Sequence, residues 1–201
     1  MALIKSISGI RGTIGGKVDE NLTPLDVVKF TSAFGTWLQN NKNKKDLTLV
    51  VGRDARISGS MVNSLVTATL QGLGIHVVDL GLSTTPTVEV MVPELNADGG
   101  IILTASHNPK QWNALKLLND KGEFITGENG AEVLALAENE DFNYAEVDDL
   151  GKYETREDTF DIHIQKILDL PMVDADAIKA KKFKVVVDAV NSTGGIAIPQ
   201  L

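Results

Sequence analysis

Apolar residues recur along the chain with the two spacings that distinguish strands from helices. Short apolar runs at 47–51, 75–80 and 99–103 predict buried strands. Between them, apolar residues at helical spacing predict amphipathic helices, and Val27 and Phe30 mark the buried face of the first. Because strands and helices alternate, we expect an α/β fold: a three-layer α/β/α domain with a mostly parallel mixed sheet.

Capping signals indicate where the helices begin. Thr23 precedes Pro24, and this pair is typical of an N-cap followed by the first helical turn. Ser58 and Thr85 are placed in the same way before the second and third helical segments. The remaining pattern predicts helices over 127–140 and 155–170, an edge strand over 1–8 and a glycine-bearing loop over 11–17.

The same pattern divides the chain into three parts. Residues 1–152 are expected to form the main domain, and residues 153–182 a helix and a linker. Residues 183–201 are interpreted as the truncated start of a second domain, whose first strand is expected over 184–188, before the polar turn Asn191–Gly195. The chain therefore predicts one complete core and the opening of another.

Composition restricts the classes of protein that fit. The chain has 201 residues, 43% of them hydrophobic, which is enough for a full core. Its formal net charge of −8 argues against attraction to nucleic acid, and the lack of cysteine removes disulfides and thiolate metal sites. Neither a signal peptide nor an apolar run of the ~18–20 residues that span a bilayer is evident. A soluble, cytoplasmic protein without nucleic-acid or membrane partners is expected.

One polar loop carries most of the candidate chemistry. Thr104-Ala105-Ser106-His107-Asn108-Pro109 follows the predicted strand 99–103, and its Asn-Pro pair is typical of a turn. Ser106 is thereby placed at the carboxyl end of a strand, the edge where open α/β sheets bind ligands. Lys116 follows on the next apolar segment. A serine hydroxyl on a tight loop, with a cation nearby, suits the transfer of a phosphoryl group.

This hexapeptide resembles the phosphoserine loop of the α-D-phosphohexomutases, the family of phosphoglucomutase, phosphomannomutase and phosphoglucosamine mutase. Two further segments resemble motifs of that family and occur in the family's order: Gly9-Ile10-Arg11-Gly12-Thr13 and Gly52-Arg53-Asp54-Ala55-Arg56-Ile57-Ser58-Gly59. The resemblance covers the first domain of such an enzyme and the opening of the second. It implies a fragment, inactive by itself, of a longer enzyme with domains II to IV missing.

The resemblance also implies roles for the site residues. Ser106 would carry the phosphoryl group and exchange hexose 1-phosphate with hexose 6-phosphate, through a hexose 1,6-bisphosphate that also serves as activator. Lys116 would act as the general acid and base. Arg11, flanked by glycines, would contact a phosphate group. Mg²⁺ would bind through the phosphate on Ser106, with its aspartate ligands in the second domain.

The other motif residues have supporting roles in this interpretation. His107 neighbours Ser106 on an extended loop and so points elsewhere, which argues against a serine–histidine dyad; we expect it to support the loop or to lie near the substrate. Ala114 stands where the family commonly has glycine, which predicts a slightly different turn before the lysine. The residues expected to shape or brace the serine loop are Thr104, Asn108, Arg53, Asp54 and Arg56.

Two rival interpretations stay open. The missing aspartate loop favours a standalone phosphosugar-binding or interaction module without turnover. A serine hydrolase is disfavoured, because the chain has no Gly-x-Ser-x-Gly elbow and no histidine placed as a base. Glucose, mannose and glucosamine are all open as the sugar.

Overall fold

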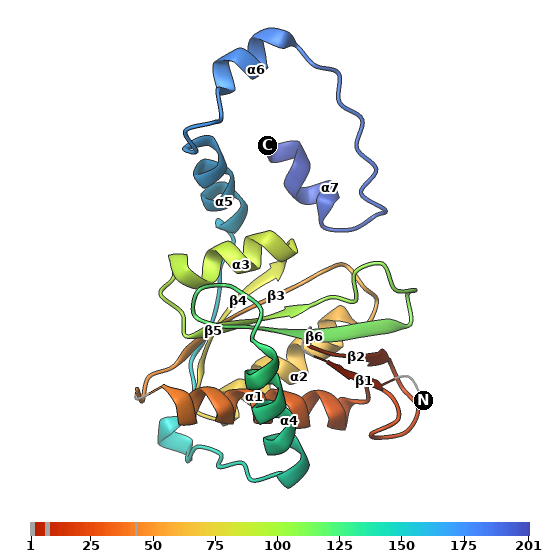
Figure 1. Cartoon of the computed structure of the whole chain (residues 1–201), viewed down its shortest axis with the longest axis vertical. Coiled ribbons are helices and arrows are strands. Elements are labelled where there is room, and N and C mark those ends of the chain that lie inside the picture. The colour runs from red at the N-terminus through yellow and green to blue at the C-terminus, as the bar shows by residue number, and fades with distance from the viewer. Residues whose placement is uncertain (1–2, 7–8, 43) are drawn as a thin grey trace.

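The computed structural model describes residues 3–6, 9–42 and 44–201, which include a seven-stranded sheet (Figure 1). The strands lie in the order β1-β2-β6-β5-β3-β4-β7. Pairing is parallel from β5 through β3 and β4 to β7, and antiparallel from β1 through β2 and β6 to β5. The expected α/β architecture with a mixed sheet is confirmed. The strand bounds are β1 Leu3–Ser6, β2 Gly9–Thr13, β3 Thr48–Arg53, β4 His76–Leu82, β5 Gly99–Leu103, β6 Trp112–Leu118 and β7 Tyr153–Thr155.

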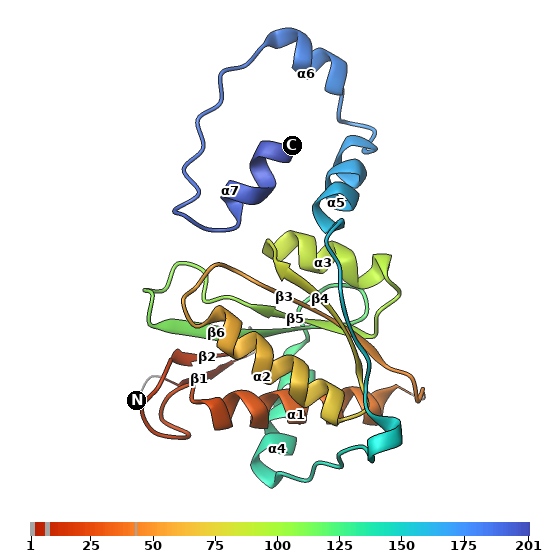
Figure 2. The same cartoon turned by 180° about the vertical axis from the view of Figure 1, so that it is seen from behind.

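Helices cover the two faces of the sheet unequally (Figures 1 and 2). One face carries α1 (Pro24–Asn41), α2 (Gly59–Gly72) and α4 (Gly127–Asn139), and the other carries α3 (Thr85–Glu94), against which α5 (Thr159–Leu168) packs. Successive β3 residues alternate between two cores. Leu49 and Val51 join the core that includes α1 and α2, and Val50 joins the core that includes α3. The α3 face of β2 and β6 is left without a covering helix (Figure 1).

The sequence signals at the helix starts have a structural basis. Thr23 is the N-cap of α1 and forms a capping box, in which the Asp26 carboxylate accepts a hydrogen bond from the Thr23 N–H at 3.0 Å. The N-cap of α3 is Thr84, one residue before the expected position, because its hydroxyl accepts a hydrogen bond from the Thr87 N–H at 3.3 Å. Polar side chains thus set the start of a helix on each face of the sheet.

Short strands account for two corrections to the expected elements. Arg11, expected on a loop, lies in β2, because this segment pairs with β1 on one side and β6 on the other. The helix expected from Thr155 begins at Thr159, because residues 153–155 pair with β4 as β7. Of the edge strand expected over 1–8, Leu3–Ser6 form β1, and the other four residues lie outside the described part of the chain.

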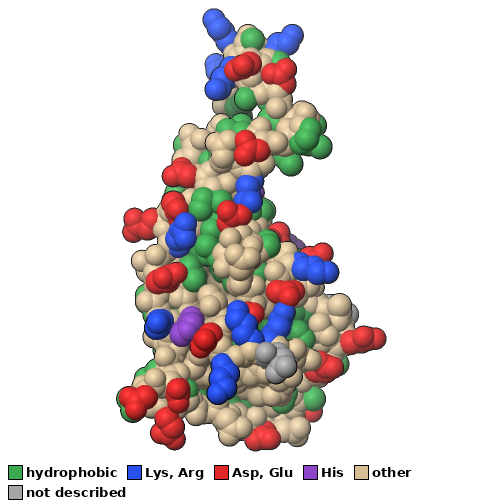
Figure 3. All heavy atoms as spheres, turned by 90° about the vertical axis from the view of Figure 1, so that its left-hand side faces the viewer, with side chains coloured by type: hydrophobic (Ala, Val, Ile, Leu, Met, Phe, Trp, Pro, Cys, Tyr) green, Lys and Arg blue, Asp and Glu red, His purple; other side chains and the backbone are tan. Residues whose placement is uncertain are grey.

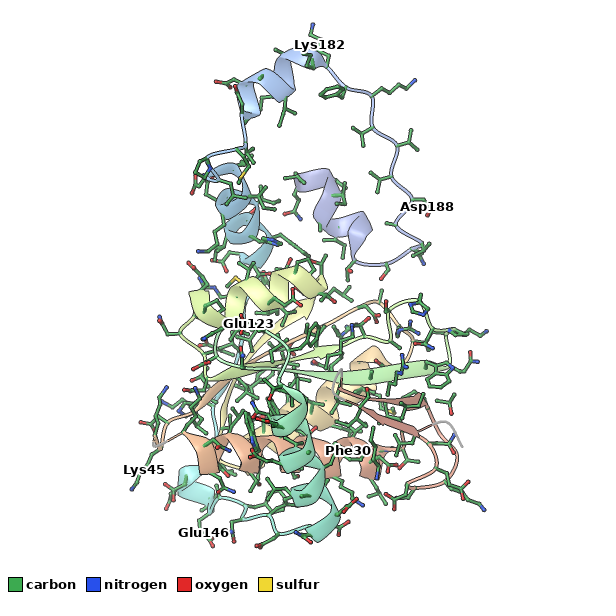
Figure 4. The ribbon with its side chains drawn as sticks, viewed as in Figure 1. Phe30, Lys45, Glu123, Glu146, Lys182 and Asp188 are labelled. Atoms are coloured by element: carbon green, nitrogen blue, oxygen red, sulfur yellow. The ribbon has the colours of Figure 1, made fainter. Side chains whose placement is uncertain are left out.

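Beyond α5 the chain leaves the sheet domain (Figures 1 and 2). An extended segment joins α6 (Ala175–Lys181) to α7 (Gly194–Ala197), and Figure 4 labels Lys182 and Asp188 along it. The strand expected over 184–188 is wrong: these residues are exposed and pair with no strand in the described part of the chain. An isolated extended segment has no partner for its backbone hydrogen bonds, so it does not become a strand. Two short 3₁₀ helices complete the described elements, at Val147–Asp149 and Ile198–Gln200.

The surface around the turn before β3 carries charges of both signs. This turn, marked by Lys45 in Figure 4, lies on the side of the molecule that faces the viewer in Figure 3, where basic and acidic side chains are interspersed. Lys44 pairs with Asp98 at 2.9 Å, and Lys42 pairs with Asp120. Among the described residues, no helix is both long enough and apolar enough to cross a bilayer.

Candidate active site

The serine loop leaves the sheet at the carboxyl end of β5. Because β5 runs parallel to β3, with Leu103 opposite Arg53, the segments that follow the two strands leave the sheet side by side. The loop then returns as β6, which is antiparallel to β5 and brings Lys116 opposite Ile102. The structure therefore places Ser106 at the sheet edge that the sequence indicated, with Lys116 on an adjacent strand.

Arg11 and Lys116 share the uncovered face of the sheet. Arg11 lies opposite Ala114, and alternate residues of a strand point to the same side, so Lys116 lies on that side as well. Gly9 permits the close contact between β2 and β6. Its φ is +106°, and a Cβ atom there would lie 2.1 Å from the carbonyl oxygen of Leu115. Two cations from different strands are thereby brought to one end of the serine loop.

These side chains and the loop enclose a small pocket of about 110 Å³. Pockets for drug-sized ligands usually measure ~300–1,000 Å³, so this one suits a phosphate group better than a whole sugar phosphate. Every residue expected to act in catalysis contributes to its wall. The lining residues are Arg11, Thr104, Ala105, Ser106, His107, Asn108, Ala114 and Lys116.

Ser106 has an unusual backbone conformation. Its φ is +53°, in the left-handed region that residues other than glycine rarely adopt, at a cost of about 1–3 kcal/mol. Its N–H donates to the Thr104 hydroxyl at 3.1 Å. The residue is exposed, so its hydroxyl is accessible at the pocket. A strained backbone that surrounding contacts hold in place is typical of functional loops.

Arg11 lines the pocket and has a hydrogen-bond donor without a partner among the described residues. Its Nε atom is buried and has no hydrogen-bond partner among the described residues. A buried donor without an acceptor costs about 1–3 kcal/mol, and an anionic ligand would supply the acceptor. Arg11 therefore has a donor that is free for an acceptor outside the described residues.

Lys116 has two neighbours that the sequence did not single out. Its Nζ lies 5.6 Å from the centroid of the Phe124 ring, within the range of a cation–π contact. Burial raises the pKa of the Glu89 carboxyl, and the positive charge of Lys116 opposes that rise. Phe124 follows β6 after a glycine turn and Glu89 lies on α3, so only the folded chain brings them together.

The motif that follows β3 supports the serine loop from behind. Asp54 accepts a hydrogen bond from the Thr104 hydroxyl at 2.6 Å and another from the Arg56 Nε at 3.2 Å. The Arg56 guanidinium in turn donates to backbone carbonyls of the loop, Ser106 and Asn108 among them. These contacts are the ones that a bracing role requires. Arg53 contacts the backbone of Asp54 at 3.2 Å rather than the loop.

The start of β6 differs from what the sequence suggested. Ala114 lies within the strand, opposite Arg11, so the altered turn expected before Lys116 is wrong. Asn113 is fully buried and donates from Nδ2 to the Ser58 hydroxyl at 3.0 Å, which ties β6 to the start of α2. Nothing in its local sequence indicated this contact. His107 is exposed at the pocket rim.

The described residues contain no complete site for the metal that the resemblance implies. Among them, no group of three or more histidine, cysteine, aspartate or glutamate side chains is placed to hold an ion. Mg²⁺ usually needs carboxylate, phosphate and water oxygens in octahedral geometry. The site that the resemblance implies, with the phosphate on Ser106 and aspartates of the second domain as ligands, stays a prediction.

The fold and the pocket define a class of protein: α/β/α domains that present a serine hydroxyl, an arginine and a lysine at one edge of a mixed sheet. Residues 3–144 match the family model described as "Phosphoglucomutase/phosphomannomutase, alpha/beta/alpha domain I". This match covers more than half of the chain, and the chain belongs to that family.

Individual relatives agree with the family match. The chain is 38% identical over 192 residues to a phosphoglucomutase/phosphomannomutase of Thermococcus kodakarensis, covering 94% of the chain and 41% of the relative. It is 36% identical to a phosphoglucosamine/phosphogalactosamine mutase of Sulfurisphaera tokodaii, covering 99% and 42%. The phosphoglucomutase pp63/parafusin of Paramecium shares the fold, with a TM-score of 0.77 at 20% identity and coverage of 98% and 40%. The chain thus spans about two-fifths of the length of these relatives.

Proposed function

We propose that this chain is the first domain of a phosphohexomutase, an isomerase that moves a phosphoryl group between the 1- and 6-positions of a hexose. Ser106 carries the phosphoryl group, and Arg11, Lys116 and His107 complete the site. The substrate is a hexose phosphate, a hexose 1,6-bisphosphate acts as intermediate and activator, and the enzyme is cytoplasmic. Family membership supports this proposal, and so does the pocket, which joins Arg11 of one motif and the serine loop of another with Lys116 on β6.

The proposed transfer can be written for the residues of the pocket. The bond between phosphorus and the Ser106 Oγ breaks while a bond forms between phosphorus and a sugar hydroxyl oxygen. Lys116, in its neutral form, accepts the proton of that hydroxyl. Arg11 donates from Nε to an oxygen of the transferring group, which places positive charge where negative charge is concentrated. The Ser106 Oγ takes up a proton from solvent as it leaves. In the return step it releases that proton and forms a bond to the second phosphorus of the bisphosphate, the bond from that phosphorus to the sugar oxygen breaks, and Lys116 gives its proton to that oxygen.

The free Nε–H donor of Arg11 is the main observation in support of this proposal. A buried Nε without an acceptor, next to an accessible serine on a strained loop, is an arrangement that a phosphoserine would complete. A phosphate on serine adds about −1.5 to −2 charges and three acceptor oxygens. Arg11 and Lys116 would neutralise that charge.

Intact-mass measurement tests the proposal directly. A full-length protein that contains this chain, incubated with glucose 1,6-bisphosphate, should gain one phosphoryl group, located on Ser106. Ser106→Ala should prevent the gain and remove nearly all mutase activity with little loss of stability, because the residue is exposed. Ser64→Ala, at an exposed serine of α2 outside the pocket, is the control.

Two outcomes would contradict the proposal. Normal turnover by a folded Ser106→Ala protein would remove Ser106 from the reaction. Binding of hexose phosphates without any phosphorylation would favour the alternative, a phosphosugar-binding module without turnover.

A further inference from the structure

Arg56 has an environment opposite to that of Arg11, although both belong to motifs near the serine loop. Its side chain is only 10% exposed, and it reaches from the turn after β3 to the loop after β5. A guanidinium has five N–H donors in a rigid fork. In Arg56 each donor position is occupied, by the Asp54 carboxylate at 3.2 Å and by the carbonyl oxygens of Ser106 at 2.8 Å, Asn108 at 2.8 Å, Pro109 at 2.9 Å and Trp112 at 3.0 Å.

Because all five N–H donors of Arg56 are occupied, Arg56 is excluded as a ligand-binding residue. It has no donor left for a ligand, and it does not line the pocket that contains Ser106 and Arg11. Any effect of Arg56 on the proposed reaction must therefore pass through the loop. The residue is a candidate for positioning the serine, not for binding the phosphate.

The contacts of Arg56 continue to the other side of Ser106. Asp54 accepts hydrogen bonds from the Arg56 N–H at 3.0 Å and from the Thr104 hydroxyl at 2.6 Å. The Thr104 oxygen accepts one from the Ser106 N–H at 3.1 Å. Arg56 thus holds the carbonyl of Ser106 directly and its N–H through two intermediates. Both ends of the one loop residue with positive φ are fixed by the same network.

Charge gives this arrangement a second consequence. Four backbone carbonyls of the loop and its entry into β6 carry partial negative charges, and all four contact the same cation. Carbonyl oxygens that turned toward the pocket would repel a phosphate group on Ser106. Their contacts with Arg56 hold them in place and offset their charge.

We propose that Arg56 is a positioning residue that fixes the strained conformation of Ser106 through its fork of N–H donors, so that a positive charge alone cannot replace it. The catalytic significance of this role rests on the proposed function, whereas the effect on the loop does not. Lysine concentrates three donors on a single nitrogen and cannot reach four carbonyls and a carboxylate together.

Hydrogen exchange of the 201-residue chain tests the proposal. The amides of Ser106 and Asn108 donate within the loop, so they report its order. In Arg56→Lys these amides should exchange at least ~10-fold faster, the factor expected for loss of one hydrogen bond to a charged group. The amides of Ile101 and Ile102 in β5 should keep their protection. In Arg56→Ala, millimolar methylguanidinium should restore the protection of these two amides, and methylammonium should not. A merely structural role of Arg56 would not produce this difference between the two cations.

A matched substitution controls for loss of a guanidinium as such. Arg156 contacts a carboxylate two residues away, as Arg56 does, but Asp158 and Arg156 both lie outside the serine loop. Arg156→Lys should leave the exchange of Ser106 and Asn108 unchanged. A second measurement, phosphorylation of Ser106 by glucose 1,6-bisphosphate in the full-length protein, should be slowed by Arg56→Lys and not by Arg156→Lys.

The outcomes separate this proposal from the proposed function. Loop protection that is unchanged in Arg56→Lys, or equally lost in Arg156→Lys, would overturn the role of Arg56. An Arg56→Lys chain that loses its cooperative melting would also overturn it, because Arg56 would then support the whole sheet. A wild-type protein that accepts no phosphoryl group would overturn the proposed function, while the exchange measurement would still decide the role of Arg56.

Discussion

At the scale of single residues, the proposed role of Lys116 depends on the groups that surround its amine. β6 fixes its backbone next to the serine loop, the Phe124 ring faces its ammonium group, and Glu89 is near enough for its carboxyl to be affected by the lysine charge. Burial raises the pKa of Glu89, so its carboxyl holds a proton to higher pH than an exposed carboxyl does. Lys116 therefore lies between an aromatic face, a carboxyl group and the proposed phosphoserine.

Replacement of Lys116 tests the proposed proton transfer. Lys116→Met keeps the length and apolar stem of the side chain but removes the amine, so kcat of the full-length enzyme should fall by ~10² or more. Steady-state kinetics across pH would measure the effect. Lys110→Met, at an exposed lysine between the serine loop and β6, should have kcat close to wild type. Near-normal kcat for Lys116→Met at every pH would contradict the assignment.

The site residues that the sequence indicated share one property: each belongs to a segment at the carboxyl edge of the sheet or to a strand beside it. Motif order and the sheet-edge rule were enough to bring Ser106 and Lys116 together. The sequence separated Arg11, expected to contact a phosphate, from Arg56, expected to brace the loop. It could not show how many donors each guanidinium has free, because for Arg56 that number depends on the path of a loop fifty residues away. Phe124 and Glu89 were missed because their positions depend on a turn and on the docking of α3.

At the scale of secondary structure, the contact between α3 and α5 includes a titratable group. The Nδ1 atom of His163 on α5 lies 2.9 Å from the hydroxyl of Thr87 on α3. Burial lowers the pKa of His163. Lys166 on α5 also pairs with Glu94 on α3 at 2.5 Å, so a charged pair lies in the same contact. Neutral His163 fits this contact better than the protonated form.

The stability of the chain should fall on acidification as a consequence. The pKa of His163 is lower in the folded chain than in the unfolded chain, where it is near ~6.5, so below that pH the unfolded state binds more protons. The free energy of unfolding should therefore decrease as pH falls through this value, down to the folded pKa. Urea denaturation at about pH 8 and about pH 5 would measure it, and His163→Gln should show a smaller decrease. An equal decrease in both proteins would show that other groups cause the effect.

The sequence predicted elements with a clear apolar or capping pattern better than elements without one. α1 could be located because Thr23 and Asp26 form a capping box and apolar residues repeat at helical spacing. β2 and β7 could not, because β2 contains two glycines and β7 has only three residues, all exposed, so neither has an apolar pattern of its own. Their identity comes from partners: β2 pairs with β1 and β6, and β7 with β4. The failed strand at 184–188 is the converse case, an apolar pattern without a neighbour.

At the scale of the whole molecule, the chain has a well-packed part and a part that is mostly exposed. The sheet domain contains both hydrophobic cores, and Phe30 on α1 is among its fully buried side chains (Figure 4). The segment after α5 is mostly exposed, and Val186 within it is 89% exposed. Backbone amides without partners in a packed structure open readily.

Hydrogen exchange should show this difference. We expect residues 184–188 to exchange close to the rate of an unstructured peptide, whereas residues 49–51 of β3 should be among the most protected. Exchange followed by mass spectrometry of the same sample provides the comparison. Equal protection of the two segments in a verified monomer would mean that the terminal segment belongs to the core of the sheet domain.

The three residues of β7 also determine where a shortened chain, produced as the first domain alone, can end. Ending the chain at residue 152 would remove β7, one of the two neighbours of β4, and expose a row of unpaired backbone groups, the kind of edge along which separate molecules aggregate. It would also remove the Tyr153 hydroxyl, which donates to the buried Asp79 carboxylate at 2.9 Å. A soluble first domain therefore has to extend beyond β7, and retaining α5 keeps the apolar surface of α3 covered as well.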